Sequence, residues 1–279
     1  MLTYGVLLGG SVLTARRAGP GGIRLLFRGL LRWRIGWANA AVVVAAIPLA
    51  TIGVAALTGT YVTPEDGWLP VISSYLVATF VYGALLLNLW EETGWQGMAQ
   101  RHFMGRYGLM KGSLLTAVPF AVVHSPLQIR GTSGMWAALV DLGVLVLMAP
   151  AARYLVARTD VATGGSLSTV GVLHASWNAS GKLSVVDADL QYVIGLVVVA
   201  VVALIVDVVR SRSDSGVLSD HRHRHPAAAA ADSTEGGESV SPANSNPMTA
   251  DDIPRQAQAH AILRGPPVRC LRSVRQAVP

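Results

Sequence analysis

Ionisable side chains interrupt three strongly apolar segments of the sequence. They are Glu91 and Glu92 in EETGWQG, His124 in FAVVHSP and His174 in HASWN. A charged group at the centre of a membrane span costs roughly 2.5–3.5 kcal/mol, so such residues usually face the interior of a helix bundle and carry function. A carboxylate can take a proton from water and pass it to a leaving amine, and histidines can bind a metal that activates water. The pattern therefore indicates a hydrolytic site or an ion site.

Each segment taken singly also has an ordinary structural interpretation. Two glutamates can mark the end of a helix, and a lone histidine in an apolar helix is usually a packed core residue. His174 and Asn178 are four residues apart and share a helix face, where both can hydrogen-bond a neighbouring helix as packing contacts. An asparagine amide in this position can equally stabilise the oxyanion of a tetrahedral intermediate.

The depths of these residues favour the functional interpretation. At 1.5 Å per residue, Glu91, His124 and His174 each lie roughly 12–16 Å from the arginine-rich end of their helix. Three separate helices thus place them at one level, which packed core residues have no reason to share. We therefore expect these three residues and Asn178 to line one cavity that opens toward the arginine-rich side, with Glu92 nearby.

A membrane-spanning scaffold is predicted around these residues. Hydrophobic residues make up 52% of the 279-residue chain and charged residues 14%, whereas soluble domains carry about 25% charged residues. The charges gather between apolar runs that are long enough to cross a bilayer as helices. The predicted fold is all-α, a polytopic transmembrane bundle of about six to eight helices. Six spans are predicted, at 37–58, 70–98, 113–129, 135–157, 166–181 and 190–209.

The distribution of basic residues predicts the orientation of this bundle. One set of alternating connecting segments carries thirteen Arg and Lys residues, and the other set carries two. The positive-inside rule places the arginine-rich side in the cytoplasm. This topology accounts for the net charge of +6, so we expect no nucleic-acid partner. The chain is predicted to be a multi-pass protein of the cell membrane with a cytoplasmic C-terminal tail.

The N-terminal region divides into two parts. Residues 1–14 are apolar but short, and they fit either a short first transmembrane segment or the core of a signal peptide. Basic residues follow this segment rather than precede it, which favours a transmembrane segment. Residues 15–36 form a basic amphipathic cytoplasmic segment, which either binds anionic lipid in the headgroup layer or serves only to orient the chain.

Beyond the last span, residues 211–279 are predicted to form a disordered cytoplasmic tail. Small and polar residues dominate there, with no apolar period that could offset the entropy of ordering. The run HRHRH at 221–225 could bind a metal, but its arginines repel a cation, which favours a solvated stretch. The one cysteine, Cys270, lies in this tail and excludes a disulfide framework within one chain.

The three polar segments resemble the motifs of a protease family. EETGWQG, FAVVHSP and HASWN are similar, in this order, to the double-glutamate, FxxxH and HxxxN motifs of the CAAX-protease and bacteriocin-processing (CPBP, or Abi) family. The stretch RYGLMKGSLL between the first two motifs is also typical of bacterial members. The resemblance covers about residues 15–210. It implies a CPBP-like intramembrane protease domain at 37–210, an endopeptidase or metalloendopeptidase of CAAX-protease type.

The resemblance also implies roles for individual residues. Glu91 would activate the attacking water, and Asn178 would help to form the oxyanion hole. His124 and His174 would bind the water or a metal. If the cofactor is a divalent metal, with zinc as the candidate, the implied ligands are Glu91, His124 and His174. Glu92 is the second carboxylate of the first motif and completes the implied catalytic set.

The sequence departs from the family at Gln96. The family has an arginine four positions after the second glutamate, whereas the glutamine of this chain can hydrogen-bond Glu92 but supplies no charge. This departure casts doubt on full activity. We therefore expect Gln96→Arg to raise activity, because a cation beside Glu92 would hold its rotamer by a charge-assisted hydrogen bond.

Three functions are compatible with these observations. The leading hypothesis is an intramembrane endopeptidase that hydrolyses a peptide bond of a membrane-associated protein or peptide. The alternative is a catalytically weak or inactive family member that acts in bacteriocin immunity or as a membrane scaffold. Glutamate and histidine can also relay ions in a transporter, but the sequence contains no inverted repeat that would favour transport.

Overall fold

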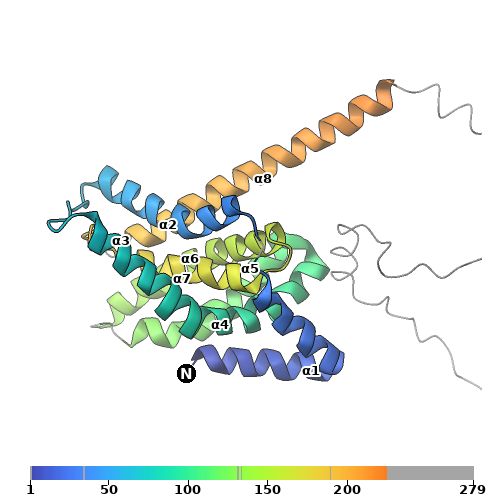
Figure 1. Ribbon diagram of the computed structural model, residues 1–279, viewed down its shortest axis with the longest axis horizontal. Helices are drawn as coiled ribbons and strands as arrows, with labels where there is room; N and C mark the ends of the chain where they lie inside the picture. The colour runs from blue at the N-terminus through green and yellow to red at the C-terminus, as the bar shows by residue number, and fades with distance from the viewer. Residues whose placement is uncertain (1, 34, 131, 133, 189, 225–279) are drawn as a thin grey trace, which may run out of the picture.

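The computed structural model describes residues 2–33, 35–130, 132, 134–188 and 190–224, and the fold is all-α, as predicted. These residues form no strand and one isolated β-bridge, between Tyr61 and Val186. Figure 1 shows the helices gathered into a bundle. In chain order the helices are α1 (Leu2–Arg28), η1 (Gly29–Leu31), α2 (Trp37–Thr58), α3 (Trp68–Val77), η2 (Ala78–Asn88), α4 (Leu89–Gly94), η3 (Trp95–Gln100), α5 (Arg101–Ile129), α6 (Met135–Ala162), α7 (Leu167–Ser180) and α8 (Gln191–Arg224).

Fewer helical segments than the six predicted spans are long and apolar enough to cross a membrane. Four such segments are found among the described residues, namely Trp37–Thr58, Trp68–Ile129, Met135–Ala162 and Gln191–Arg212. The second segment contains two of the predicted spans. Gly108 divides them with a φ of 81°, a left-handed conformation that glycine adopts without steric cost. The predicted fifth span corresponds to α7, whose 14 residues are too few to cross a membrane by length.

The short helix α7 forms the centre of the bundle. All of its residues except Asn178 are buried, and it packs against α2, α4, α6 and η2, in the middle of the view in Figure 1. Ser166 caps its first turn, because the hydroxyl accepts the backbone N–H of Thr169. A helix of 14 residues extends only about 21 Å. Because nearly all of this short helix is buried, protein rather than lipid surrounds His174.

Helices α1 and α4 cross at two glycines. A Cβ added at Gly10 would lie 2.9 Å from the Cα of Gly94, and a Cβ at Gly94 would collide with the backbone carbonyl of Val6. The lack of side chains at both positions lets the two helices touch. The axis of α1 then breaks at Gly19, which has a φ of 62°. Because α1 is not one of the four apolar segments, a transmembrane segment at residues 1–14 stays a prediction.

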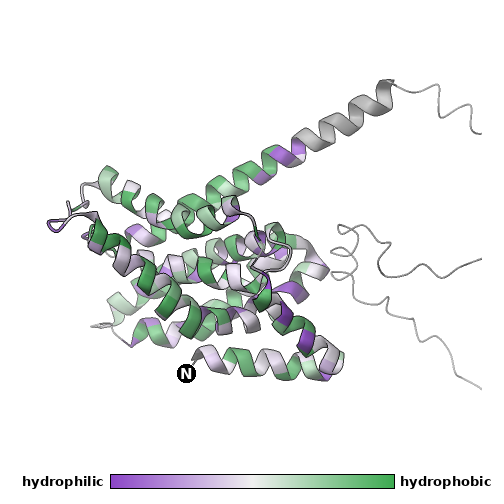
Figure 2. Ribbon diagram, viewed as in Figure 1, coloured by the Kyte–Doolittle hydropathy of each residue, from purple (hydrophilic) through white to green (hydrophobic). Residues whose placement is uncertain are grey.

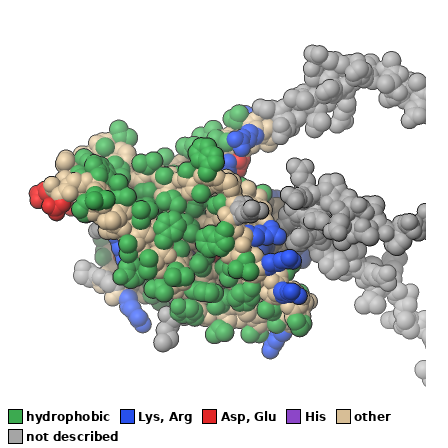
Figure 3. Space-filling model, in the orientation of Figure 1, with side chains coloured by type: hydrophobic (Ala, Val, Ile, Leu, Met, Phe, Trp, Pro, Cys, Tyr) green, Lys and Arg blue, Asp and Glu red, His purple; other side chains and the backbone are tan. Residues whose placement is uncertain are grey.

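Large apolar side chains cover the sides of the bundle. Leu57, Leu69, Trp136 and Leu147 are each exposed over most of their surface. Figure 2 shows hydrophobic residues along the outer faces of the helices, and Figure 3 shows that they dominate the visible surface. In water such a surface would drive aggregation, whereas in a bilayer it is the expected lipid-facing surface. The chain is therefore a membrane protein.

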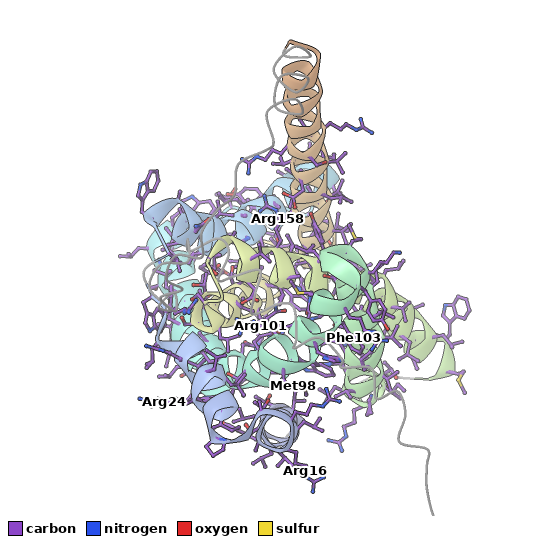
Figure 4. The ribbon with its side chains drawn as sticks, turned by 90° about the vertical axis from the view of Figure 1, so that its right-hand side faces the viewer. Arg16, Arg24, Met98, Arg101, Phe103 and Arg158 are labelled. Atoms are coloured by element: carbon purple, nitrogen blue, oxygen red, sulfur yellow. The ribbon has the colours of Figure 1, made fainter. Side chains whose placement is uncertain are left out.

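Basic and acidic residues gather at opposite ends of the bundle. Figure 3 shows most of the visible Lys and Arg side chains at one end and the acidic side chains of the loop between α2 and α3 at the other. Figure 4 looks onto the basic end, where Arg16 and Arg24 come from α1, Arg101 from α5 and Arg158 from α6. These ends correspond to the arginine-rich and arginine-poor sides that the sequence predicted.

Helix α8 continues to Arg224, beyond residue 209 where its span was predicted to end. Residues 211–224 of the predicted tail are therefore helical, and its remainder, 225–279, lies outside the described residues. Within the bundle, α8 is anchored to α6 through Asp207. This carboxylate accepts from the Tyr154 hydroxyl at 2.7 Å and from Nε of Arg158 at 3.0 Å.

Candidate active site

A cavity of about 240 Å³ collects the residues that the sequence singled out. Its lining includes Glu91, His124, His174 and Asn178, so the expected convergence of these four side chains is confirmed. Asn88 adds another polar group. The apolar lining comes from Leu87, Phe120, Leu127, Leu145, Met148 and Trp177. The cavity thus combines a cluster of polar side chains with apolar ones.

The two glutamates lie on α4, a short α-helical turn between the π-helical segments η2 and η3. π-Helical segments are rare in proteins and are found frequently at functional sites. Their hydrogen bonds join residues five apart, so residues four apart do not share a face as they do in an α-helix. Glu91 lines the cavity, whereas Glu92 is completely buried and faces α6 and α7.

Glu91 and His124, which we call the cavity pair, lie within hydrogen-bonding distance of each other. Oε1 of Glu91 lies 3.2 Å from Nε2 of His124, and Oε1 has no other hydrogen-bond partner among the described residues. Nδ1 of His124 lies 2.8 Å from the carbonyl oxygen of Phe120. A carbonyl can only accept, so Nδ1 carries a proton, and Nε2 is an acceptor when the ring is neutral. In that state the cavity pair presents two acceptors to the cavity.

Phe120 connects the two histidines. Its ring stacks on His124 at a centroid distance of 4.1 Å and lies 6.2 Å from the ring of His174. Trp95 packs edge-on against Phe120, at a centroid distance of 5.7 Å. Trp177 stacks on His174 at 5.2 Å. Both histidine rings are therefore held by aromatic contacts as well as by hydrogen bonds.

A second polar cluster, which we call the buried network, consists of Glu92, Arg153, His174 and Gln100. Nη1 of Arg153 donates to the two oxygens of Glu92 at 2.8 and 3.1 Å. Nδ1 of His174 lies 2.8 Å from Oε1 of Glu92. Nε of Arg153 donates to Oε1 of Gln100 at 2.7 Å, and Nη2 also donates to this oxygen. Both oxygens of Glu92 thus have partners, in contrast to the unpartnered Oε1 of Glu91.

The expectation that Gln96 leaves Glu92 without a cation is wrong. Arg153, on α6, supplies the positive charge. Gln96 instead donates from Nε2 to Oδ2 of Asp160 at 2.9 Å, and Arg101 binds the same carboxylate at 2.6 and 2.9 Å. The i+4 pairing assumed an α-helix, but the chain is π-helical from Trp95 to Gln100. The doubt about activity that rested on Gln96 therefore loses its basis.

Sequence reasoning missed Arg153 and Gln100 as members of the buried network, and Asp160 as the partner of Gln96. Arg153 was counted among the basic residues that orient the chain, although it lies inside the predicted span 135–157. A cation within an apolar span is the same kind of signal that identified Glu91. Its position could therefore have been recognised as unusual, but its partner could not, because the partner is on another helix.

Asn178 contributes an amide to the lining of the cavity. Its Nδ2 lies 3.4 Å from Oδ1 of Asn88, which is a long hydrogen bond. An amide nitrogen has two N–H donors, and this contact uses one of them. Asn178 is also the exposed residue of an otherwise buried helix, so its side chain reaches the cavity rather than the protein core.

The cavity reaches toward the arginine-poor end of the bundle. Thr3, Leu127, Gln128 and Tyr192 belong to its lining. Each lies within two residues of an end of its helix, and the ends of α5 and α8 concerned adjoin the arginine-poor loops. The expected opening toward the arginine-rich side is therefore corrected. A common depth of the polar residues along their helices does not determine which side of that depth is filled by side chains.

The residues as they lie do not fit a three-ligand metal centre. No group of three His, Cys, Asp or Glu side chains within the described part of the chain is close enough together to hold a metal ion. Glu91 and His124 could supply two ligands. His174 belongs to the predicted ligand set, and because its Nδ1 is bound to Glu92, Nε2 is the nitrogen that it could offer to a metal. The use of a metal therefore stays a prediction.

Comparison with known proteins agrees with the motifs. A family model described as type II CAAX prenyl endopeptidase Rce1-like matches residues 72–180. The matched segment contains all three motifs and every member of the cavity pair and the buried network. A search of curated proteins found no match. Residues 72–180 are therefore similar to a family of the CAAX-protease type that the three motifs resemble.

Proposed function

We propose that the protein is an intramembrane endopeptidase that hydrolyses a peptide bond of a membrane-associated protein or peptide. The observation that carries the proposal is the cavity pair, in which Oε1 of Glu91 and Nε2 of His124 lie 3.2 Å apart beside a cavity. When the His124 ring is neutral, both atoms are hydrogen-bond acceptors, and each can accept from a donor beside them. A water molecule that directs one O–H toward each acceptor satisfies both. That water is the nucleophile.

Glu91 is the general base in this proposal. Its carboxylate takes a proton from the water while the water oxygen attacks the scissile carbonyl carbon, and His124 accepts the second hydrogen bond and aims the water. The C–N bond then breaks, and Glu91 returns the proton to the leaving amine. The unpartnered Oε1 of Glu91 supports this assignment, because a base committed to a protein donor would not be free to bind water.

Asn178 and His174 support the tetrahedral intermediate. The second N–H of the Asn178 amide donates to the developing oxyanion, and a single donor of this kind contributes about 100- to 1,000-fold to the rate. His174 directs Nδ1 toward Glu92, so its Nε2 faces the opposite way. We assign this nitrogen to contacts with the substrate or the water.

The cavity wall favours a substrate that reaches the site from the membrane. Leu87, Leu127 and Leu145 place apolar surface beside the polar cluster, which suits hydrophobic residues on either side of the scissile bond. The family model is named for CAAX prenyl endopeptidases. A lipid-anchored or transmembrane peptide is therefore the substrate class that we propose.

A cleavage assay tests this function. Purified protein in lipid nanodiscs is incubated with a library of membrane-anchored peptides, and the products are identified by mass spectrometry. We expect internal cleavage by the native protein and none above background by Glu91→Gln. Equal product patterns from the two proteins would refute the proposal.

Metal binding is a separate proposal, and no step above depends on it. Glu91, His124 and His174 would be the ligands of a zinc ion, which would lower the pKa of a bound water. The measurement is the zinc content of the purified protein. About one zinc per chain, lost in His124→Ala, would support a metal site, and a metal-free native protein that cleaves peptides would exclude it.

We also propose that the arginine-rich end lies in the cytoplasm of a cell-membrane protein, with the C-terminal tail on the same side. Exposed arginines of α1, among them Arg16, Arg17, Arg24 and Arg28, stand beside exposed leucines such as Leu25. This combination suits a headgroup layer with anionic lipid. Cysteine labelling at position 16 in intact cells tests the orientation, because a membrane-impermeant reagent should fail to reach it.

A further inference from the structure

Arg153 is the largest side chain that the bundle buries almost completely, with 1% of its surface exposed. Burial of a cation is costly unless each of its donors finds a partner. Here Nη1 binds Glu92, while Nε and Nη2 bind Gln100. Gln100 in turn donates from Nε2 to the backbone carbonyl of Arg153 at 2.7 Å. The guanidinium group is therefore fixed in one orientation by contacts on both sides.

This guanidinium group contacts the immediate neighbours of both histidines. Through Glu92 it is one hydrogen-bonded residue away from Nδ1 of His174. Its central carbon also lies 5.3 Å from the centroid of the Phe120 ring, within the range of a cation–π contact. Phe120 stacks on His124 and accepts from its Nδ1. Arg153 itself does not line the cavity.

We propose that Arg153 is a positioning residue that orients His174 through Glu92 and His124 through Phe120. The inference rests on the proposed function and adds to it a residue outside the three sequence motifs. Arg153 donates to both oxygens of Glu92 and so fixes the orientation of this side chain. Glu92 in turn holds Nδ1 of His174 at 2.8 Å, which directs Nε2 of that ring away from Glu92. The same cation fixes the Phe120 ring against which His124 stacks.

A structural ion pair with no role in catalysis is the alternative, and kinetic constants separate the two. Loss of positioning lowers kcat and leaves KM nearly unchanged, because the interaction acts on the reacting groups and not on substrate binding. Removal of residues that orient functional groups typically costs about 10- to 100-fold in activity. For Arg153→Met we expect a decrease of this size in kcat, with KM within about twofold of the native value. Arg153→Lys should recover part of the loss, because lysine keeps the charge but not the planar fork.

The matched control is Arg158→Met. Arg158 is also on α6 and also binds a carboxylate, that of Asp207, but it has no contact with the buried network. We expect native kcat and KM for this variant. If Arg153→Met fails to fold, Gln100→Ala replaces it, because this change releases the guanidinium group without leaving Glu92 unpaired. A kcat decrease in Gln100→Ala at constant KM would support the inference, and unchanged kinetics would overturn it.

A measurement that does not depend on peptide cleavage keeps this inference separate from the proposed function. Diethyl pyrocarbonate modifies accessible histidines, and peptide mass spectrometry reports the modification rate of each one. The exposed His102 is the internal reference. We expect His124 and His174 to react several-fold faster relative to His102 in the Arg153→Met or Gln100→Ala variant, and not in Arg158→Met. Unchanged rates would overturn the inference even if the protein is a protease, and faster rates would support it even if no peptide is cleaved.

Discussion

Glu91 and Glu92 are neighbours in sequence but belong to two different environments. Glu92 is completely buried, and both of its oxygens have charged or polar partners in the buried network. Glu91 is also buried, yet its Oε1 has no hydrogen-bond partner among the described residues. Adjacent residues on a helical turn point about 100° apart, so one carboxylate reaches the cavity while the other reaches α6. Two identical side chains thereby acquire two different sets of surroundings.

The different surroundings of the two carboxylates suggest that Glu91 affects mainly activity and Glu92 mainly stability. A buried polar atom without a partner costs stability, and such costs are usual where a site must receive water or substrate. A completely paired buried ion pair has the opposite property, because removal of either partner leaves an uncompensated charge. We therefore expect changes at Glu91 to lower activity and changes at Glu92 to lower stability.

The largest effect should come from Glu91→Gln. An amide cannot take a proton from water, so we expect the rate of peptide cleavage to fall by about 100- to 10,000-fold. The thermal midpoint in detergent should be unchanged or higher, because the variant removes an unpartnered charge. Glu65→Gln, in the exposed acidic loop, is the control for loss of a carboxylate. A decrease in the thermal midpoint of Glu91→Gln as large as the one expected for Glu92 variants would contradict the assignment of activity to Glu91 and stability to Glu92.

Glu92→Gln should instead destabilise the fold. It leaves the guanidinium group of Arg153 buried without a counter-charge, and breaking a buried ion pair in this way costs about 3–5 kcal/mol. The measurement is the free energy of unfolding in mixed micelles. The double variant Glu92→Gln with Arg153→Met should regain most of the loss, because both charges are then absent. Equal stabilities of the single and double variants would show that Arg153 does not depend on Glu92.

The sequence predicted the cavity residues better than the buried network for a physical reason. Glu91, His124 and His174 are ionisable groups within apolar spans, and the cost of burying such groups makes them recognisable one by one. The partner of Glu92 was assigned by α-helical spacing, which fails where η3 widens the helix. Arg153 comes from a helix about sixty residues further along the chain. Only tertiary packing brings it to Glu92.

In the fold, too, the features that follow from local sequence were predicted, and those that depend on packing between helices were not. Apolar length predicted the positions of α2, α6 and the first part of α8 well, because the bilayer sets that length. Length alone did not predict that α7 is central and buried on nearly every side. Its small residues, such as Gly171 and Ala175, allow close packing, since a Cβ at Gly171 would lie 2.8 Å from a side-chain atom of Leu89. That close packing between α7 and α4 is what brings His174 to Glu92.

Gly10→Leu is expected to have a moderate effect, because it should displace Glu91 and Glu92 together. The added side chain would meet the backbone of α4 at Gly94, and overpacking of this kind costs about 1–3 kcal/mol. Because α4 carries Glu91 and Glu92, stability and cleavage rate should decrease together. Gly9→Leu is the matched control, since nothing lies within 4 Å of a Cβ at Gly9. A Gly10→Leu protein with native stability and activity would show that α1 is not packed on α4 in this way.

The smallest effect is expected from Gln96→Arg, for which the sequence alone suggested a gain in activity. Glu92 already binds Arg153, so a second cation adds little to a carboxylate that is fully paired. The amide of Gln96 points to Asp160, and an arginine in its place would join Arg101 at that carboxylate. We expect the cleavage rate to change by less than about fivefold, which corresponds to about 1 kcal/mol. Steady-state kinetics of the two proteins, with folded protein isolated by size-exclusion chromatography, provide the measurement. A gain above about tenfold that disappears in Glu92→Gln would mean that Glu92 lacks a sufficient cation in the native protein. In that case Arg153 would not be its functional partner, and the contrast between a paired Glu92 and an unpaired Glu91 would no longer hold.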